Sequence, residues 1–123
     1  MDRRILVVGD DPLVSGAVKE VLDVELGCDV NVAHCRCDAS SQMAVQPFDM
    51  VITDLYMPGM DGLDLMGQIQ ARHPRTCLIL MTAEMGPHVV QALSRVGDLE
   101  RLRKPFSGED LLSMVERGLT QVI

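Results

Sequence analysis

Aromatic residues are scarce in this sequence: two phenylalanines, one tyrosine and no tryptophan occur among its 123 residues. A platform of aromatic rings, on which single-stranded nucleic acids stack, is therefore excluded. Positive charge is also in deficit, since 18 acidic residues outnumber 11 lysines and arginines and the net charge is −7. Because a broad basic surface is missing as well, we expect this domain to bind no nucleic acid.

Long apolar runs are lacking too. No stretch approaches the roughly 18 consecutive apolar residues of a membrane-spanning helix. The N-terminus also lacks the apolar segment of a signal peptide. We therefore expect a cytoplasmic protein without a membrane partner.

Cysteine occurs four times, but never with the Cys-x-x-Cys spacing of many zinc and redox sites. The stretch "HCRC" (residues 34–37) could in principle bind a metal ion, yet it has no matching distal pair of ligands. Ordinary reduced thiols are therefore the favoured interpretation of Cys28, Cys35, Cys37 and Cys77.

What the sequence does contain is a regular alternation of short apolar runs and amphipathic segments. Apolar runs predict buried strands over residues 3–10, 49–54 and 77–82. Alternating patterns predict a strand that flanks the sheet over residues 28–34 and an edge strand with one wetter face over residues 99–104. Apolar residues at helical spacing predict helices over residues 12–26, 38–46, 63–73, 87–96 and 107–119. Five strands alternating with five helices predict one α/β domain (residues 1–123), a doubly wound (βα)5 parallel sheet covered on both faces.

Several helix ends carry recognisable signals. Pro12 suits a first helical turn and Gly27 suits a C-terminal cap. Ser107 and Asp110 have the spacing of a capping box, which predicts the start of the last helix.

Polar residues close four of the five expected strands. The first strand ends in Asp10 and Asp11, the third in Asp54, the fourth in Thr82 and the fifth in Lys104. Ligands bind outside the carboxyl ends of the strands of an open parallel sheet. We therefore expect three acids, one hydroxyl and one amine to converge on one edge, and this convergence is the functional signal.

Phosphoryl transfer to a carboxylate fits this set of side chains. Asp54 is the predicted nucleophile and would form an aspartyl phosphate. The three acids would repel one another without a hard cation, and Mg²⁺ binds one or two carboxylates while bridging to phosphate oxygens. Lys104 would offer a positive charge to one phosphoryl oxygen and Thr82 a hydroxyl to another. The backbone carbonyl of Tyr56 is expected to complete the coordination of the cation.

Each of these residues also has a simpler interpretation. Asp11, before Pro12, is at least as good a candidate for a helix N-cap as for a metal ligand. Asp61 with Gly62 is better explained as a cap and turn than as a ligand pair. Thr82 alone would be a strand-end residue, and a lone lysine would be solvated. The three histidines share no spacing and are predicted to be surface or packed residues.

Two other functional classes compete with this interpretation. A metal-dependent phosphatase of the aspartyl-phosphate type would need a second acid two residues after the nucleophile, where this chain has Tyr56. A flavin or nucleotide binder would need a phosphate loop rich in glycine or hydroxyls after the first strand. The stretch "GDDP" (9–12) is acidic instead and would repel phosphate without a metal ion.

Four motifs, in this order, resemble those of bacterial response-regulator receiver domains of two-component signalling, the CheY-like superfamily. They are "LVVGDDP" (6–12), "ITDLYMPGMDG" (52–62), "LILMTA" (78–83) and "RKPF" (103–106). The resemblance covers the whole chain. It implies a flavodoxin-like fold with the strand order 2-1-3-4-5.

The resemblance also implies a role for each matched residue. Asp54 becomes the phosphoacceptor, and Asp10 and Asp11 become the acid pair for Mg²⁺ or Mn²⁺. Thr82 becomes the switch hydroxyl, and Lys104 the lysine that contacts the phosphoryl group. A cis peptide bond is implied between Lys104 and the proline that follows it, Pro105.

The implied partners are a sensor histidine kinase or a phosphotransfer protein as donor, and an output domain or a partner protein downstream. A homodimer that forms on phosphorylation is a further expectation. The domain would catalyse its own phosphorylation and autodephosphorylation, although its role would be that of a switch rather than of a turnover enzyme. Phosphorylation would shift the face formed by residues 87–119.

One position departs from the family pattern. Receiver domains usually carry an aromatic residue three positions before the lysine, whereas this chain has Arg101. A guanidinium cannot enter an apolar slot as an aromatic ring does without a heavy desolvation cost. We therefore expect an electrostatic or weakened readout at Arg101. A receiver-like scaffold whose switching is weakened or independent of phosphorylation remains the alternative.

Overall fold

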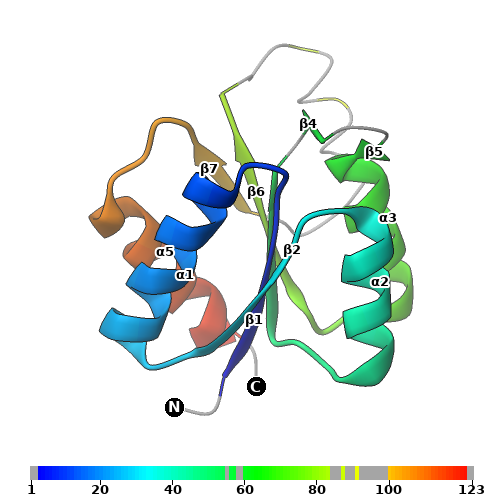
Figure 1. Cartoon of the computed structure of the whole chain (residues 1–123), viewed down its shortest axis with the longest axis horizontal. Helices are drawn as coiled ribbons and strands as arrows, with labels where there is room; N and C mark the ends of the chain where they lie inside the picture. The colour runs from blue at the N-terminus through cyan, green and yellow to red at the C-terminus, as the bar shows by residue number, and fades with distance from the viewer. Residues whose placement is uncertain are drawn as a thin grey trace.

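Five parallel strands form the central sheet of the computed structural model, which describes residues 3–54, 56–57, 60–83, 87, 91 and 100–121. The strand order is β2-β1-β3-β6-β7 (Figure 1), which is 2-1-3-4-5 when only the strands of this sheet are counted along the chain. Both the α/β class and the expected strand order are thus confirmed. The strands are β1 (Arg4–Val8), β2 (Asp29–Ala33), β3 (Met50–Asp54), β6 (Cys77–Thr82) and β7 (Glu100–Arg103).

Helices cover both faces of this sheet. Figure 1 shows α1 (Pro12–Leu26) and α5 (Gly108–Gln121) on one face, and α2 (Arg36–Val45) and α3 (Gly62–Arg72) on the other. The helix expected over residues 87–96 lies almost wholly outside the described residues. Helix α2 begins earlier than predicted, because Cys35 acts as its N-cap and accepts a hydrogen bond from the backbone N–H of Asp38.

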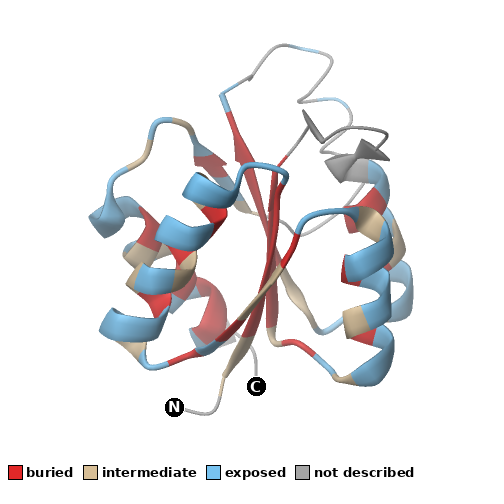
Figure 2. Ribbon diagram, viewed as in Figure 1, coloured by how far each residue is buried: buried red, intermediate tan, exposed pale blue. Residues whose placement is uncertain are grey.

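The alternation of side chains along the strands divides the core into two layers. Ile5 and Val7 pack on the side of α1 and α5, whereas Leu6 and Val8 pack on the side of α2 and α3. All four side chains are fully buried, and the strands form the buried centre of the molecule in Figure 2. A strand that is buried on both faces has a continuous apolar sequence, which is why β1, β3 and β6 were visible as apolar runs.

The predicted helix ends are also confirmed. Helix α1 begins at Pro12 and ends at Gly27, whose φ of 64° lies in the left-handed region that suits glycine. At the start of α5, the N–H of Asp110 donates to Ser107 Oγ and the N–H of Ser107 donates to Asp110 Oδ2. This reciprocal pair is the capping box that the sequence predicted.

A short hairpin between β3 and α3 was not predicted. Strand β4 (Tyr56–Met57) pairs in an antiparallel manner with β5 (Met60–Asp61), immediately after the strand that ends in Asp54. Asp61, expected to cap α3, is the last residue of β5. Strands of two residues are too short to show the alternation by which strands are recognised.

Membrane crossing was also considered for the helices that the structure describes. None of them combines the length and the apolar character that a bilayer span requires.

Candidate functional site

Asp54 lies at the carboxyl end of β3, in the middle of the sheet between β1 and β6. Its side chain is only 7% exposed, and Lys104 Nζ lies 2.5 Å from its Oδ1 atom. This contact is an ion pair rather than a directed hydrogen bond, because no described group has hydrogen-bond geometry toward Asp54 Oδ1. An ionised carboxylate that is buried needs a nearby positive charge, which the ammonium group of Lys104 supplies.

Lys104 follows the last residue of β7, and its position depends on the neighbouring strand. Its backbone N–H donates to the carbonyl of Thr82 at 2.9 Å, which ties the end of β7 to the end of β6. The peptide bond between Lys104 and Pro105 is cis, as the resemblance implied. The side chain is 34% exposed, so the ammonium group reaches Asp54 from the solvent side of the site.

Thr82 completes a trio at this edge. It is the last residue of β6 and is 3% exposed. The register pairs Asp54 with Met81, so Thr82 lies one residue beyond the direct neighbour of Asp54. The structure therefore brings Asp54, Thr82 and Lys104 together, as the topology predicted.

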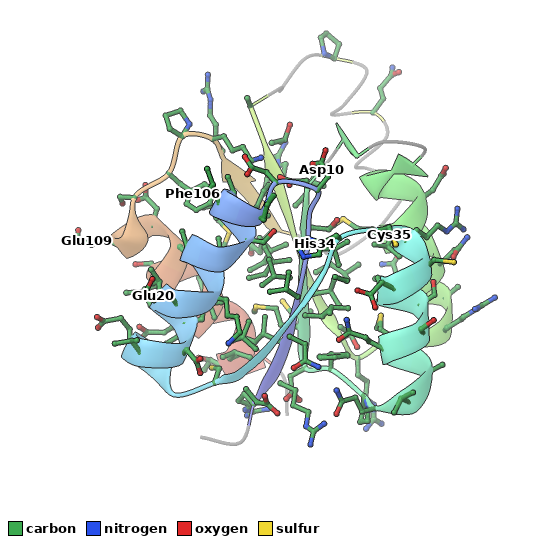
Figure 3. The ribbon with its side chains drawn as sticks, in the orientation of Figure 1. Asp10, Glu20, His34, Cys35, Phe106 and Glu109 are labelled. Atoms are coloured by element: carbon green, nitrogen blue, oxygen red, sulfur yellow. The ribbon has the colours of Figure 1, made fainter. Side chains whose placement is uncertain are left out.

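The two acids after β1 have different surroundings. Asp11 is the N-cap of α1, and its Oδ1 accepts a hydrogen bond of 3.0 Å from the N–H of Leu13. The capping interpretation of Asp11 is thus confirmed. Asp10 is exposed and lies where the chain leaves β1 (Figure 3). The described residues contain no group of three or more His, Cys, Asp or Glu side chains placed to hold a metal ion.

A smaller donor set still fits Mg²⁺ at this edge. Asp54 Oδ1 is buried and has only the ion pair with Lys104 among the described residues, and Asp10 supplies a second carboxylate at the end of the adjacent strand. Mg²⁺ usually binds through one or two carboxylates and keeps several waters, so two acids are sufficient. The backbone of Tyr56 lies in β4, directly after this site, and its carbonyl remains a predicted ligand.

Gly9 is the residue whose role the sequence analysis missed. It is buried, and a Cβ atom at this position would lie 2.6 Å from Asp54 Oδ2 and 3.2 Å from Ser15 Oγ. The carboxylate of Asp54 therefore rests against the backbone of Gly9. The available signal was a glycine directly after a buried strand, which often marks a close approach to another group.

A Gly9→Ala variant is expected to bind Mg²⁺ at least about tenfold more weakly than the wild-type protein. The added Cβ atom would lie 2.6 Å from Asp54 Oδ2, so the carboxylate would have to move away from its position. The measurement is a Mg²⁺ titration followed by the fluorescence of Tyr56, the single tyrosine in a chain without tryptophan. Gly16→Ala, which adds a Cβ atom in open space on α1, is the control, and an unchanged affinity in Gly9→Ala would contradict the prediction.

The four cysteines are divided between the interior and the surface. Cys28 is buried, and burial raises the pKa of its thiol. Burial also raises the pKa of Cys77, with a further contribution from the negative charge of Glu100. Cys35 and Cys37 are exposed. All four are free thiols.

A groove beside Lys104 gathers positive charge in this acidic protein. It has a volume of about 720 Å³, and its walls come from β7, the following turn and α5. Arg101, Arg103 and Arg117 line it, together with one acid, Asp110. Arg101 is exposed in β7, on the edge of the sheet.

The chain is similar to known proteins over almost its whole length. A family model described as a response regulator receiver domain matches residues 5–116. The DNA-binding transcriptional regulator NtrC of Escherichia coli (strain K12) is 31% identical over 98% of this chain and 26% of its own length. The response regulator protein FleR of Pseudomonas aeruginosa is 36% identical over 95% of this chain and 24% of its own length.

A solved structure is also similar to the whole chain. The chemotaxis protein CheY4 of Vibrio cholerae matches with a TM-score of 0.88 and 26% identity over 100% of both chains. In contrast, the present chain spans only about a quarter of the length of the curated relatives NtrC and FleR.

Proposed function

The chain belongs to the family of response regulator receiver domains, and we propose that it is a signalling switch that accepts a phosphoryl group on Asp54. The observation that supports this most strongly is the state of the Asp54 carboxylate. It is buried at the end of β3 and paired with Lys104, and among the described residues no donor has hydrogen-bond geometry toward its Oδ1 atom. Such a group is costly to keep unless the function requires it.

The described side chains would share the work of phosphoryl transfer. An Asp54 oxygen attacks the phosphorus atom of the donor, and the bond from phosphorus to the donor nitrogen or oxygen breaks. Lys104 already lies at the Asp54 carboxylate and would stay close to the negatively charged phosphoryl oxygens. Thr82, at the end of the adjacent strand, would donate its hydroxyl to another phosphoryl oxygen.

Asp10 and Asp54 would hold Mg²⁺ or Mn²⁺, with Asp11 and the carbonyl of Tyr56 as further ligands. The cation, when bound, would neutralise carboxylate charge so that an anionic phosphoryl group can approach. The backbone of Gly9 would keep the Asp54 carboxylate in place during this approach.

The expected donor is the phosphohistidine of a sensor histidine kinase or a phosphotransfer protein in the cytoplasm. The signal would pass to an output domain or a partner protein through the face that includes β7 and α5. Arg101 and Arg103 are exposed there, which favours a partner with an acidic surface. Phosphorylation would stabilise one of two arrangements of this face and could drive dimerisation by the same shift.

The exposure of Arg101 also favours a second candidate function, a receiver-like scaffold with weakened switching. Arg101 lies in solvent rather than in an apolar slot, and moving its charge inward would cost several kcal/mol. The two candidates share the acceptor site. They differ in whether phosphorylation changes the β7–α5 face.

Incubation with acetyl phosphate and Mg²⁺ is expected to add one phosphoryl group to the protein. Intact mass spectrometry measures the addition, and a parallel sample with a chelator in place of Mg²⁺ should stay unmodified because the carboxylates would then repel the donor. Absence of added mass at saturating Mg²⁺ would refute the proposed function.

A further inference from the structure

His34 is joined to the backbone beside Asp54 by a hydrogen bond that no sequence motif predicts. Its Nδ1 atom lies 3.2 Å from the carbonyl oxygen of Gly9, 25 positions earlier in the chain. Because a carbonyl oxygen only accepts, Nδ1 must carry the hydrogen. In Figure 3 His34 lies at the end of β2, next to the segment that leads from β1 to Asp10.

This contact replaces a bond that the sheet does not supply. The N–H of Gly9 donates to the carbonyl of Ala33 at 3.0 Å, one step beyond the last paired residues of β1 and β2. If the parallel ladder continued, the Gly9 carbonyl would accept from the N–H of residue 35. The chain instead turns at this point, and Cys35 caps α2. The exposed side chain of His34 therefore takes the place of that ladder bond at the carbonyl of Gly9.

Both polar backbone groups of Gly9 are thus held by the end of β2. The same residue is the surface on which the Asp54 carboxylate rests, since even a Cβ atom there would lie 2.6 Å from Asp54 Oδ2. The carbonyl that His34 binds also belongs to the peptide unit that joins Gly9 to Asp10. Rotation of this peptide unit would move Asp10 and the wall beside Asp54 together.

We propose that His34 is a positioning residue for the cation and phosphoryl site. It fixes the peptide between Gly9 and Asp10, and thereby sets where the Asp10 carboxylate lies relative to Asp54. This inference rests on the proposed function for its role in phosphoryl transfer, but its effect on cation binding can be measured separately. Neither the four sequence motifs nor the trio of Asp54, Thr82 and Lys104 includes His34.

The test compares His34→Asn with His34→Leu. Asparagine and leucine have nearly the same shape, but only asparagine carries an N–H donor at the branch position that Nδ1 occupies in histidine. His34→Leu is expected to raise the Mg²⁺ concentration for half-saturation by about tenfold, as loss of an outer hydrogen bond to a metal site typically does. His34→Asn should stay close to the wild-type value, and so should His73→Asn, which changes a histidine after α3 at the opposite edge of the sheet.

Two readouts separate positioning from a purely structural role. The first is the Mg²⁺ titration by Tyr56 fluorescence, and the second is the rate of phosphoryl uptake from acetyl phosphate at limiting and at saturating Mg²⁺. His34→Leu should be slow at limiting Mg²⁺ and recover most of its rate at saturation. A structural role alone would lower the midpoint of thermal unfolding and leave the half-saturating concentration unchanged. If leucine impairs folding, His34→Ala provides the same comparison.

The outcomes are distinct. Wild-type half-saturation in His34→Leu would overturn the inference, and so would an equal loss in His34→Asn, since the hydrogen bond would then not be the cause. A shifted Mg²⁺ titration in a protein that takes up no phosphate would refute the proposed function while supporting the role of His34.

Discussion

Asp54→Asn is expected to abolish phosphoryl uptake, lowering the rate by at least about 1,000-fold, below the limit of intact-mass detection. The amide of asparagine has no anionic oxygen with which to form an acyl phosphate. The substitution preserves shape and removes a buried charge, so the variant should fold. Loss of labelling would then reflect the chemistry of position 54 rather than loss of structure.

The matched control is Asp49→Asn. Asp49 lies just before β3, at the opposite end of the same strand, where its carboxylate accepts a hydrogen bond from the N–H of Arg4 at 2.8 Å. This variant should take up one phosphoryl group at the wild-type rate. Equal labelling of Asp54→Asn and the wild-type protein would show that another side chain is the acceptor.

The sheet and the central trio were predictable because both follow from local pattern plus one rule of topology. β3 and β6 are apolar runs that are buried on both faces, and each ends in a polar residue. Parallel strands align their carboxyl ends at one edge, so Asp54, Thr82 and Lys104 had to meet there once the fold class was known. No knowledge of side-chain conformations was needed.

The packing of Gly9 against Asp54, together with the hydrogen bond from His34 to Gly9, could not be predicted from local pattern and topology. It depends on the register of β1 against β2 and on the exact residue at which β2 leaves the sheet, neither of which leaves a periodic signal. Cys35 adds to the difficulty, because cysteine is not among the usual N-cap residues. The sequence therefore identified the residues that meet at this edge of the sheet and missed those that pack beside them.

The second large effect is expected on the free energy of unfolding when the ion pair between Lys104 and Asp54 is broken. Lys104→Met is expected to lower the free energy of unfolding by about 2 kcal/mol in the presence of a chelator. Removal of one partner of a buried pair typically costs more, but the side chain of Lys104 is 34% exposed and its charge is partly screened. The cost arises because the Asp54 carboxylate, only 7% exposed, would remain without a counter-charge.

A double-mutant cycle, measured by urea unfolding, isolates the coupling energy between Lys104 and Asp54. Because Asp54→Asn removes the charge that Lys104 neutralises, adding Lys104→Met to it should cost little, which gives a coupling energy of about 1–2 kcal/mol. The control pair is Lys19 with Asp23, 3.1 Å apart and 43% and 49% exposed on α1, whose separation should cost less than about 0.5 kcal/mol. Equal losses from Lys104→Met in the two backgrounds would contradict the coupling.

Magnesium is expected to change the stability of the same variants, because a cation at Asp54 would replace the positive charge that Lys104→Met removes. Saturating Mg²⁺ is therefore expected to stabilise Lys104→Met more than the wild-type protein, and to leave Asp54→Asn almost unchanged. In the wild-type protein the lysine and the cation would compete for the same buried carboxylate, so part of the binding energy of Mg²⁺ would offset the ion pair. On the proposed function, Lys104 would neutralise Asp54 in the metal-free protein and would be released to contact a phosphoryl oxygen when the metal binds.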